Sequence, residues 1–275
     1  NMFAEKNITL NNITVSAGVM VNINSKYGSE YFPGIDISYK VTNDIKLFTS
    51  FNRSMRTANY TELYYSSPTD EGNIYLEPEH SSNKELGLKW NGNSHKSTIT
   101  YYQRKGKNMI DWILAAGDSI WTTQNLSKLT TSGYEINSKI NINKLLNTVL
   151  PISLLSINYA INELDTTSQG FQSKYLLDHL KSNFSITVIQ KINNKLRIDW
   201  RTSRQDREGG YTDFENSKEI DYKPFWLVSS RLTYKIFSTN SLFLEINNLF
   251  DNHYVDFGNI PQPGRWIRAG AKIKL

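Results

Sequence analysis

The residue types that most often perform chemistry in proteins are few and scattered in this chain. The four histidines, His80, His95, His179 and His253, lie far apart and lack the spacing of a metal-binding motif such as H-E-x-x-H. The sequence has no cysteine, no nucleophile elbow and no glycine-rich phosphate loop. It therefore predicts no enzyme, no bound metal and no cofactor.

Aromatic and arginine side chains are plentiful instead, and many of them fall in long links between regular segments. Rings and polar groups that converge from such links are suited to holding a ligand by contact. The candidate ligand-contacting residues are Tyr64, Tyr65, Trp112, Trp121, Arg204, Arg207, Tyr211, Phe214, Tyr254 and Phe257. This chemistry is binding rather than transformation.

Composition favours a protein in which polar and apolar residues are interleaved. Of the 275 residues, 39% are hydrophobic and 12% aromatic, and the mean hydropathy is −0.49. No run approaches the roughly 18 consecutive apolar residues of a membrane helix. Lys and Arg number 31 against 26 Asp and Glu, with the two signs mixed along the chain, so nucleic-acid binding is not expected.

Alternation of apolar and polar residues runs through the chain with a period of two. In 196–201, Leu, Ile and Trp alternate with Arg and Asp, and the same two-faced pattern recurs in 35–41, 134–142 and 267–275. We count about twelve such segments of roughly 9 to 13 residues, a length that lets a tilted β-strand cross a bilayer. The pattern favours membrane strands.

Short and long links alternate between these segments. Short turns are expected near 42–44, 91–95, 143–148, 191–194 and 237–240. Longer links are expected near 24–30, 57–81, 106–119, 164–177, 206–222 and 248–264. Tight periplasmic turns and extended extracellular loops give this alternation. The sequence predicts an all-β fold, a transmembrane antiparallel up-and-down β-barrel.

The charged face of each segment indicates what the barrel encloses. A charged side chain facing lipid costs about 2–4 kcal/mol at the bilayer midplane, so that face must line a wet or protein-filled lumen. A closed pore of about twelve strands would satisfy this, and so would part of a wider, plugged barrel. Periodicity leaves both alternatives open.

Three motifs resemble those of the TonB-dependent outer-membrane receptors. The first comprises Arg-Thr-Ala at 56–58, Glu-Leu-Tyr at 62–64, Gly-Asn-Ile-Tyr-Leu-Glu-Pro-Glu at 72–79 and Glu-Leu-Gly at 85–87. It is similar to the family's Arg-x-Pro, Glu-Leu and Gly-Asn-Pro-x-Leu-x-Pro-Glu segments, which precede a strand bearing Glu-x-Gly.

The other two motifs follow in the family's order. Ser-Gly-Tyr-Glu at 132–135 resembles a Gly-x-Glu strand start. Asn-Leu-Phe-Asp at 248–251, with Tyr254 and Pro-Gly-Arg at 263–265, resembles the family's closing motifs, although Leu275 stands where the last residue is usually Phe. The resemblance runs from about Gly34 to Leu275. The spacing of the motifs most closely resembles that of the cobalamin, colicin and catecholate siderophore receptors.

The resemblance implies an incomplete barrel. Residues 1–275 would be the carboxy-terminal part of a single β-barrel domain, with about 12 of about 22 strands, while the plug domain and first strands lie on sequence not included here. It implies a bacterial outer-membrane receptor for active uptake of cobalamin or a ferric siderophore. The expected partners are TonB through the plug, the amino-terminal half of the receptor, the lipid bilayer and a surface lipoprotein.

The resemblance also gives roles to particular residues. Glu85 and Glu135 would be lumen-facing carboxylates that contact plug arginines, and the strand alternation also turns both inward. Residues expected to shape loops and strand starts are Arg56, Glu62, Pro78, Glu79, Asn248, Pro263, Gly264 and Arg265. A haem receptor of the same family, with His80 or His253 as ligand, and a passive pore are alternatives; an outer-membrane hydrolase or a soluble β-rich protein is a third class.

Overall fold

The computed structural model describes residues 1–166, 170–175, 178–213, 218–237, 239–256, 258 and 260–273. The chain forms two compact units, which are described separately. The first comprises Asn1–Lys89, Thr100–Tyr134 and Asn162–His179, and the second comprises Trp90–Ile99, Glu135–Ile161 and Leu180–Leu275. The strands β6, β7, β8, β9 and β11 each contribute residues to both.

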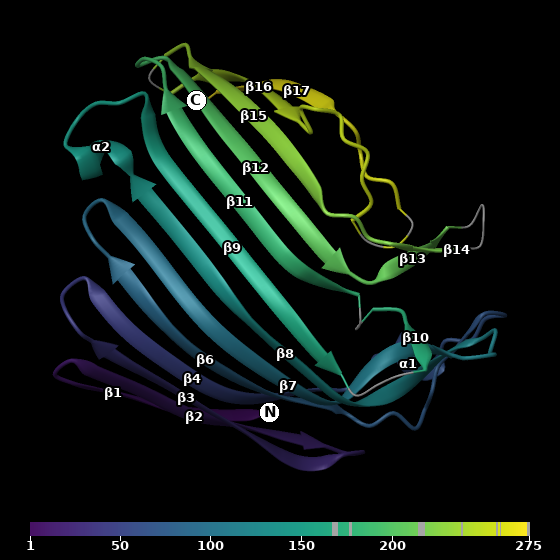
Figure 1. Ribbon diagram of the computed structural model, residues 1–275. Coiled ribbons are helices and arrows are strands. Elements are labelled where there is room, and N and C mark those ends of the chain that lie inside the picture. The colour runs from purple at the N-terminus through teal and green to yellow at the C-terminus, as the bar shows by residue number, and fades with distance from the viewer. Residues whose placement is uncertain are drawn as a thin grey trace. The chain divides into compact units, whose positions relative to one another are not determined.

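Most of the first unit is made of long strands. Its elements are β1 (Met2–Leu10), β2 (Ile13–Asn24), β3 (Gly28–Lys40), β4 (Ile45–Arg56), α1 (Tyr60–Tyr64), β5 (Asp70–Glu71), β6 (Glu79–Asn91), β7 (His95–Ala115), β8 (Trp121–Asn141) and β10 (Phe171–Ser173). The strands β2, β3 and β4 run side by side (Figure 1).

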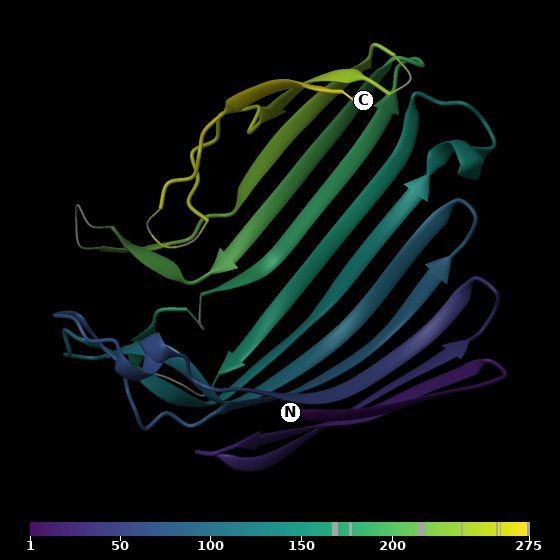
Figure 2. The same ribbon diagram turned by 180° about the vertical axis from the view of Figure 1, so that it is seen from behind.

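Long strands also dominate the second unit. Its elements are α2 (Ile142–Leu146), β9 (Ile152–Thr166), β11 (His179–Lys191), β12 (Leu196–Glu208), β13 (Gly210–Asp213), β14 (Lys218–Asp221), β15 (Phe225–Lys235), β16 (Ser241–Asn247) and β17 (Trp266–Lys272). Seen from behind, α2 lies in the link that leads into β9 (Figure 2). The β13–β14 hairpin lies between β12 and β15 in sequence and forms a separate two-stranded sheet.

Antiparallel pairing of sequential strands confirms the predicted all-β fold. The hydrogen-bonded path is β1-β2-β3-β4-β6-β7-β8-β9-β11-β12-β15-β16-β17, with β5 and β10 added at its side. In the described part of the chain, β1 and β17 each have a neighbour on one side only. The path has one strand more than the count from periodicity, because that count missed the tight turn at Asn11, where a φ of 51° lets β1 fold back onto β2.

Two of the expected long links are shorter than predicted. The link near 24–30 is a three-residue turn between β2 and β3, in which the Asn24 side chain accepts hydrogen bonds from the amides of Lys26 and Tyr27. The link near 106–119 shrinks because β7 continues to Ala115, where Phe171 in β10 supplies an antiparallel partner. Pairing with β10 therefore extends β7 beyond the residues whose apolar and polar alternation predicted a strand.

Apolar side chains meet in register on one face of the first unit. Ile35 is opposite Ala17 on β2 and Phe51 on β4, and Ile37 is opposite Val15. Ile35 and Ile37 remain 37% and 38% exposed, so no second layer of described protein covers this face. A row of exposed apolar residues suits contact with lipid chains.

In the second unit, charged side chains form a row across four neighbouring strands. Asp199 on β12 is opposite Arg231 on β15, which is opposite Glu245 on β16, which is opposite Arg268 on β17. Glu245 accepts hydrogen bonds from Arg231 at 3.0 Å and from Arg268 at 2.8 Å. The alternation of sign across neighbouring strands stabilises their register.

Buried hydrophobic residues of the first unit concentrate where the 57–78 segment meets β7 and β8. Leu76 is 1% exposed, Ile113 3% and Leu126 6%, and the hydroxyl-bearing Thr123 is fully buried. Ile110 and Trp112 on β7 and Leu129 on β8 are buried as well, and the remaining buried hydrophobic residues of the described chain are Phe32 and Tyr222. The hydrophobic core of the first unit is therefore local, and it holds the 57–78 segment against the ends of β7 and β8.

Candidate functional site

The short helix α1 begins with a reciprocal cap. The Asn59 side chain accepts a hydrogen bond from the Glu62 amide at 2.9 Å, and the Glu62 carboxylate accepts one from the Asn59 amide at 2.8 Å. This capping box satisfies two amides that a helix start otherwise leaves without partners. It also fixes the orientation of the Glu62 carboxylate.

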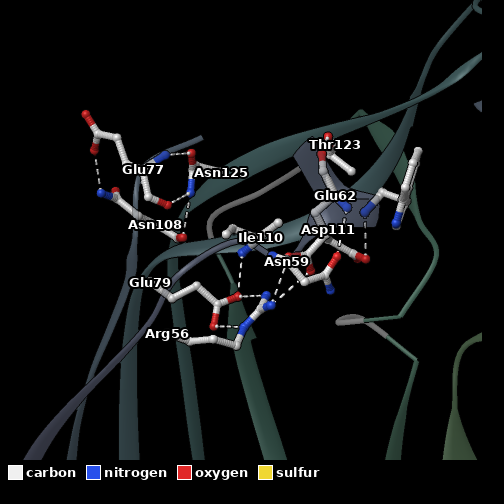
Figure 3. A network of polar contacts seen from close by, with 11 residues as sticks. Arg56, Asn59, Glu62, Glu77, Glu79, Asn108, Ile110, Asp111, Thr123 and Asn125 are labelled. Carbon is white, nitrogen blue, oxygen red and sulfur yellow. Dashed lines mark hydrogen bonds and ion pairs between the residues drawn. The ribbon is translucent and has the colours of Figure 1, made fainter. Parts of the chain in front are cut away.

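Arg56 at the end of β4 joins that helix to β6 (Figure 3). Its guanidinium donates two hydrogen bonds to Glu79, at 2.7 and 2.9 Å, and two more to Glu62, at 2.9 and 3.0 Å. The amide of Ile110 on β7 also donates to Glu79, at 2.8 Å. One arginine therefore holds two carboxylates from separate segments in a fixed geometry.

Close backbone approach locks the rest of the 57–78 segment. A Cβ on Gly72 would lie 2.9 Å from backbone atoms of Glu62, Leu63 and Tyr64, so only glycine fits there. The Asn73 amide donates to the Glu62 carbonyl at 2.9 Å, and the buried Thr123 hydroxyl donates to the same carbonyl at 2.7 Å.

A second group of polar contacts holds the approach to β6. Asn125 on β8 accepts a hydrogen bond from the Glu77 amide at 2.9 Å and donates to the carbonyls of Glu77 and Asn108 (Figure 3). Pro78 lies between Glu77 and Glu79 in the segment that these contacts hold. Arg56, Glu62, Pro78 and Glu79 thus occupy one bonded framework.

Three of the predicted ligand-contacting residues gather in an aromatic cluster, which we define as Tyr65, Trp112, Trp121, Lys174 and Asp70. The rings of Tyr65 and Trp112 meet edge to face at 6.2 Å. The Lys174 ammonium lies 5.7 Å from the ring centre of Trp112 and 5.4 Å from that of Trp121, and it donates to Asp70 at 2.8 Å. The structure thus brings together segments that are about a hundred residues apart.

The aromatic cluster differs in two respects from the expectation of loop residues. Trp112 lies within β7 and is 8% exposed, and Trp121 is the first residue of β8, so both belong to strand ends. Tyr64, another predicted contact, is outside the cluster: it lies in α1, is 61% exposed, and its ring is tilted against that of Tyr60 at 5.2 Å. The longer pairing of β7 and β8 explains the change for the tryptophans.

Asp70 gives the aromatic cluster a dependence on pH. The hydrogen bond from Lys174 holds the pKa of the Asp70 carboxyl below its usual range, with help from the Thr69 hydroxyl. A carboxyl whose pKa falls on folding stabilises the fold above the unfolded-state pKa, and this contribution is lost as the pH drops through the lower, folded-state value. We expect tryptophan fluorescence to titrate below about pH 4, and the midpoint to move to higher pH in Lys174→Gln, because the hydrogen bond that lowers the Asp70 pKa is lost. A midpoint at the same pH in that variant would contradict the assignment.

The remaining described candidates lie in the second unit. Arg204 on β12 donates to Asp206 at 3.0 Å, and Arg207 donates to Asp256 at 3.4 Å. The ring of Tyr211 lies 5.5 Å from that of Tyr222, and the ring of Tyr254 lies 4.4 Å from that of Phe225. Phe214 and Phe257 lie outside the described residues.

These rings line a cavity of about 560 Å³ between the β13–β14 hairpin and the 253–262 segment. Tyr211, Tyr222, Phe225 and Tyr254 contribute aromatic walls, and His253 lies on its lining. Burial and the nearby Asp256 carboxylate raise the pKa of the Tyr254 hydroxyl, which therefore stays protonated. The cavity can hold a bulky ligand by stacking and by hydrogen bonds.

Glu85 on β6 and Glu135 on β8 are exposed carboxylates in separate units. Among the described residues, neither makes a hydrogen bond or ion pair. The Glu85 carbonyl accepts a bond from the Thr49 hydroxyl at 2.8 Å, which fixes the backbone and leaves the carboxylate free. Both side chains are thus available to a further partner.

The closing motif is tied together by Asn248 and Asp251, both in left-handed backbone conformation. The buried Asn248 amide group donates to the carbonyl of Asn252 at 2.8 Å and to that of Pro263 at 3.4 Å. Asp251 accepts from the Arg265 amide at 2.6 Å, and a Cβ on Gly264 would lie 2.6 Å from the same carboxylate. These contacts join the 248–252 turn to the start of β17.

Sequence reasoning missed several residues of these sites. Lys174 and Asp70 carry no local signal, since their pairing arises only when two links meet. Asp111, which follows Ile110 on β7, accepts hydrogen bonds from the Ser173 hydroxyl and the Tyr175 amide. Tyr222 belongs to the expected link 206–222, but nothing in its neighbourhood distinguished it from other tyrosines.

The four histidines lie in different segments of the chain. Within the described ranges, no three His, Cys, Asp or Glu side chains lie close enough to hold a metal ion. His80 shares a hydrogen bond with Glu30 at 2.6 Å.

The described part of the chain contains no helix whose length and apolar character would suffice to cross a membrane.

Comparison with known proteins gives consistent results. The family model described as TonB dependent receptor-like, beta-barrel matches residues 1–249. The vitamin B12 transporter BtuB of Photobacterium profundum is 25% identical over 244 residues, which is 86% of this chain and 36% of that protein. The ferrienterobactin receptor of Escherichia coli is 23% identical over 290 residues, which is 96% of this chain and 38% of that protein.

Solved structures show the same fold. The siderophore receptor PirA from Acinetobacter baumannii superposes with a TM-score of 0.75 at 19% identity, over 98% of this chain and 44% of its own. The FrpB iron transporter from Neisseria meningitidis gives 0.74 at 16% identity, with the same coverage. This chain spans about two fifths of the curated relatives that it matches. It belongs to the TonB-dependent receptor family, as part of the family's β-barrel.

Proposed function

We propose that this chain is the carboxy-terminal part of the barrel of a bacterial outer-membrane receptor that imports cobalamin or a ferric siderophore with energy supplied through TonB. Family membership over residues 1–249 carries the proposal. The relatives include vitamin B12 transporters and ferric enterobactin receptors. The exposed apolar rows on β2, β3 and β4 suit a barrel wall in lipid.

The chain would supply about half of a single barrel domain. Its coverage of 36% to 41% of the relatives leaves room in the whole receptor for a plug and the first strands. The one-sided pairing of β1 and β17 in the described chain fits this division, since both edges can accept a further strand. TonB would act on the plug rather than on these residues.

Glu85 and Glu135 would contact arginines of the plug. Their carboxylates are exposed and lack partners among the described residues, so they can pair with a guanidinium from another segment. A carboxylate and an arginine inside a wet barrel form a stable pair when further hydrogen bonds offset desolvation. The two glutamates would hold the plug from two different strands.

Ligand contact would come from the two aromatic groups of the separate units. The aromatic cluster offers Tyr65 and Trp121 beside a lysine, and the cavity of the second unit offers Tyr211, Tyr254 and their neighbours. Rings bury a large area and stack on planar groups of a bulky ligand. Tyr64, Arg204 and Arg207 would widen the contact surface.

Uptake in cells tests the proposal. The full-length receptor that contains this chain would be produced in a strain without its own cobalamin and catecholate receptors, and radiolabelled cyanocobalamin and ferric enterobactin would be supplied separately. We expect saturable uptake of one of them that disappears when TonB is deleted. Uptake of neither would overturn the cargo assignment, and entry that persists without TonB would favour the passive pore.

A further inference from the structure

Several basic residues of the first unit line a cavity that the transport proposal does not use. Its volume is about 620 Å³ and it is lined from β3, β4, β6, β7 and β8. The charged lining residues are Arg53, Lys105, Lys107, Lys128 and Glu30, together with His80. We call this the basic cavity.

The four cations of the basic cavity lack counter-charges. Within the described ranges, the side chains of Arg53, Lys105, Lys107 and Lys128 make no hydrogen bond or ion pair, and all four residues are exposed. The single carboxylate of the lining, Glu30, already shares a hydrogen bond with His80 at 2.6 Å. With His80 neutral, four positive charges and one negative charge leave an excess of three.

Three other basic residues of the same unit have polar partners. Arg56 binds Glu79 and Glu62, Lys174 binds Asp70, and Arg104 donates to Asn83 at 2.9 Å. Carboxylates neutralise the charge of Arg56 and Lys174 locally. The four cations of the basic cavity have no such partner among the described residues, so their charge is available to a ligand.

The lining identifies the class of ligand. Four like charges around one cavity repel each other, and a multiply charged anion would replace that repulsion by attraction. Arginine and lysine together suit phosphate oxygens, the first through its planar fork and the second as a point charge. On the same lining the Ser54 and Ser81 hydroxyls share a hydrogen bond at 2.8 Å, so one of that pair and the Thr130 hydroxyl can donate to further oxygens. The volume falls within the usual range for small-molecule sites.

We propose that the basic cavity binds a phosphate-bearing ligand with at least two negative charges, either a phosphorylated lipid headgroup or a soluble phosphate compound. The site is separate from the aromatic groups assigned to cargo. It does not depend on which nutrient the receptor imports, so failure of the uptake experiment would leave it standing.

Binding to the purified full-length receptor tests this site. Pyrophosphate would be titrated by calorimetry into receptor held in a neutral detergent, at low and at high salt. In a second arm, receptor in phosphatidylcholine nanodiscs with and without diphosphorylated lipid A would be analysed for retained lipid. Binding of pyrophosphate that weakens with salt supports the soluble source, and selective retention of lipid A supports the headgroup.

Matched variants separate the site from general charge effects. Lys107→Gln combined with Lys128→Gln should weaken binding of the retained probe at least about tenfold, which is about 1.4 kcal/mol. Lys107→Arg combined with Lys128→Arg should keep it, and so should Lys84→Gln, which removes an exposed lysine of β6 outside the cavity. Absence of binding by both probes, or equal loss in Lys84→Gln, would overturn the proposal.

Discussion

Replacing Arg56 by methionine is expected to open the 57–78 segment without unfolding the strands. Methionine preserves much of the side-chain length but removes four hydrogen bonds to Glu62 and Glu79. Those two carboxylates are only 13% and 11% exposed, so each loses its counter-charge in a poorly hydrated place. Breaking such an arrangement costs about 2 kcal/mol when the arginine itself is partly exposed.

Hydrogen exchange measures this opening directly. A loss of about 2 kcal/mol corresponds to a roughly 30-fold rise in the exchange rate of amides that exchange by local opening. Protected amides such as those of Asn73 and Leu63 should respond. The control is Arg53→Met, which changes an arginine of the same strand that has no ion pair with a described residue. Equal exchange in wild type and Arg56→Met would show that the framework depends on other contacts.

Removing both Glu85 and Glu135 is expected to loosen the plug in the full-length receptor. If each carboxylate holds a plug arginine, the double variant Glu85→Ala and Glu135→Ala leaves those arginines uncompensated inside the barrel, a costly arrangement of several kcal/mol. The plug should then open more often, and cells should become more sensitive to large antibiotics that the outer membrane normally excludes.

Growth inhibition by vancomycin provides the measurement. We expect the double variant to be sensitised severalfold and each single variant to be sensitised less, because one remaining contact still restrains the plug. Glu163→Ala is the matched control, since it removes an exposed carboxylate from β9 outside the two motifs. Vancomycin sensitivity like that of wild type in the double variant, at equal receptor levels, counts against the contact.

The strands could be predicted from the sequence because each face of the sheet meets one environment. Ile35 and Ile37 alternate with Asp36 and Ser38 through local residue order alone, and the structure keeps that alternation in the register with β2. The end of β7 was not predictable in this way. Its last residues pair with Phe171–Ser173, a contact between segments more than fifty residues apart.

The candidate site was predictable only where a motif encoded it. Arg56, Glu62 and Glu79 were expected to shape a loop, and they form one hydrogen-bonded framework. The helix α1 was overlooked, although Asn59 and Glu62 carry the spacing of a capping box. Lys174 gave no such signal, because its role comes from meeting Asp70 across the fold.

The two edge strands of the sheet affect how the isolated polypeptide behaves in solution. β1 offers nine residues without proline, and both β1 and β17 have a strand on one side only within the described chain. The unpaired main-chain N–H and C=O groups of an edge strand can form hydrogen bonds with a strand of another molecule. A preparation of this polypeptide alone should therefore associate edge to edge, and the amino-terminal half of the proposed receptor, produced together with it, should suppress that association.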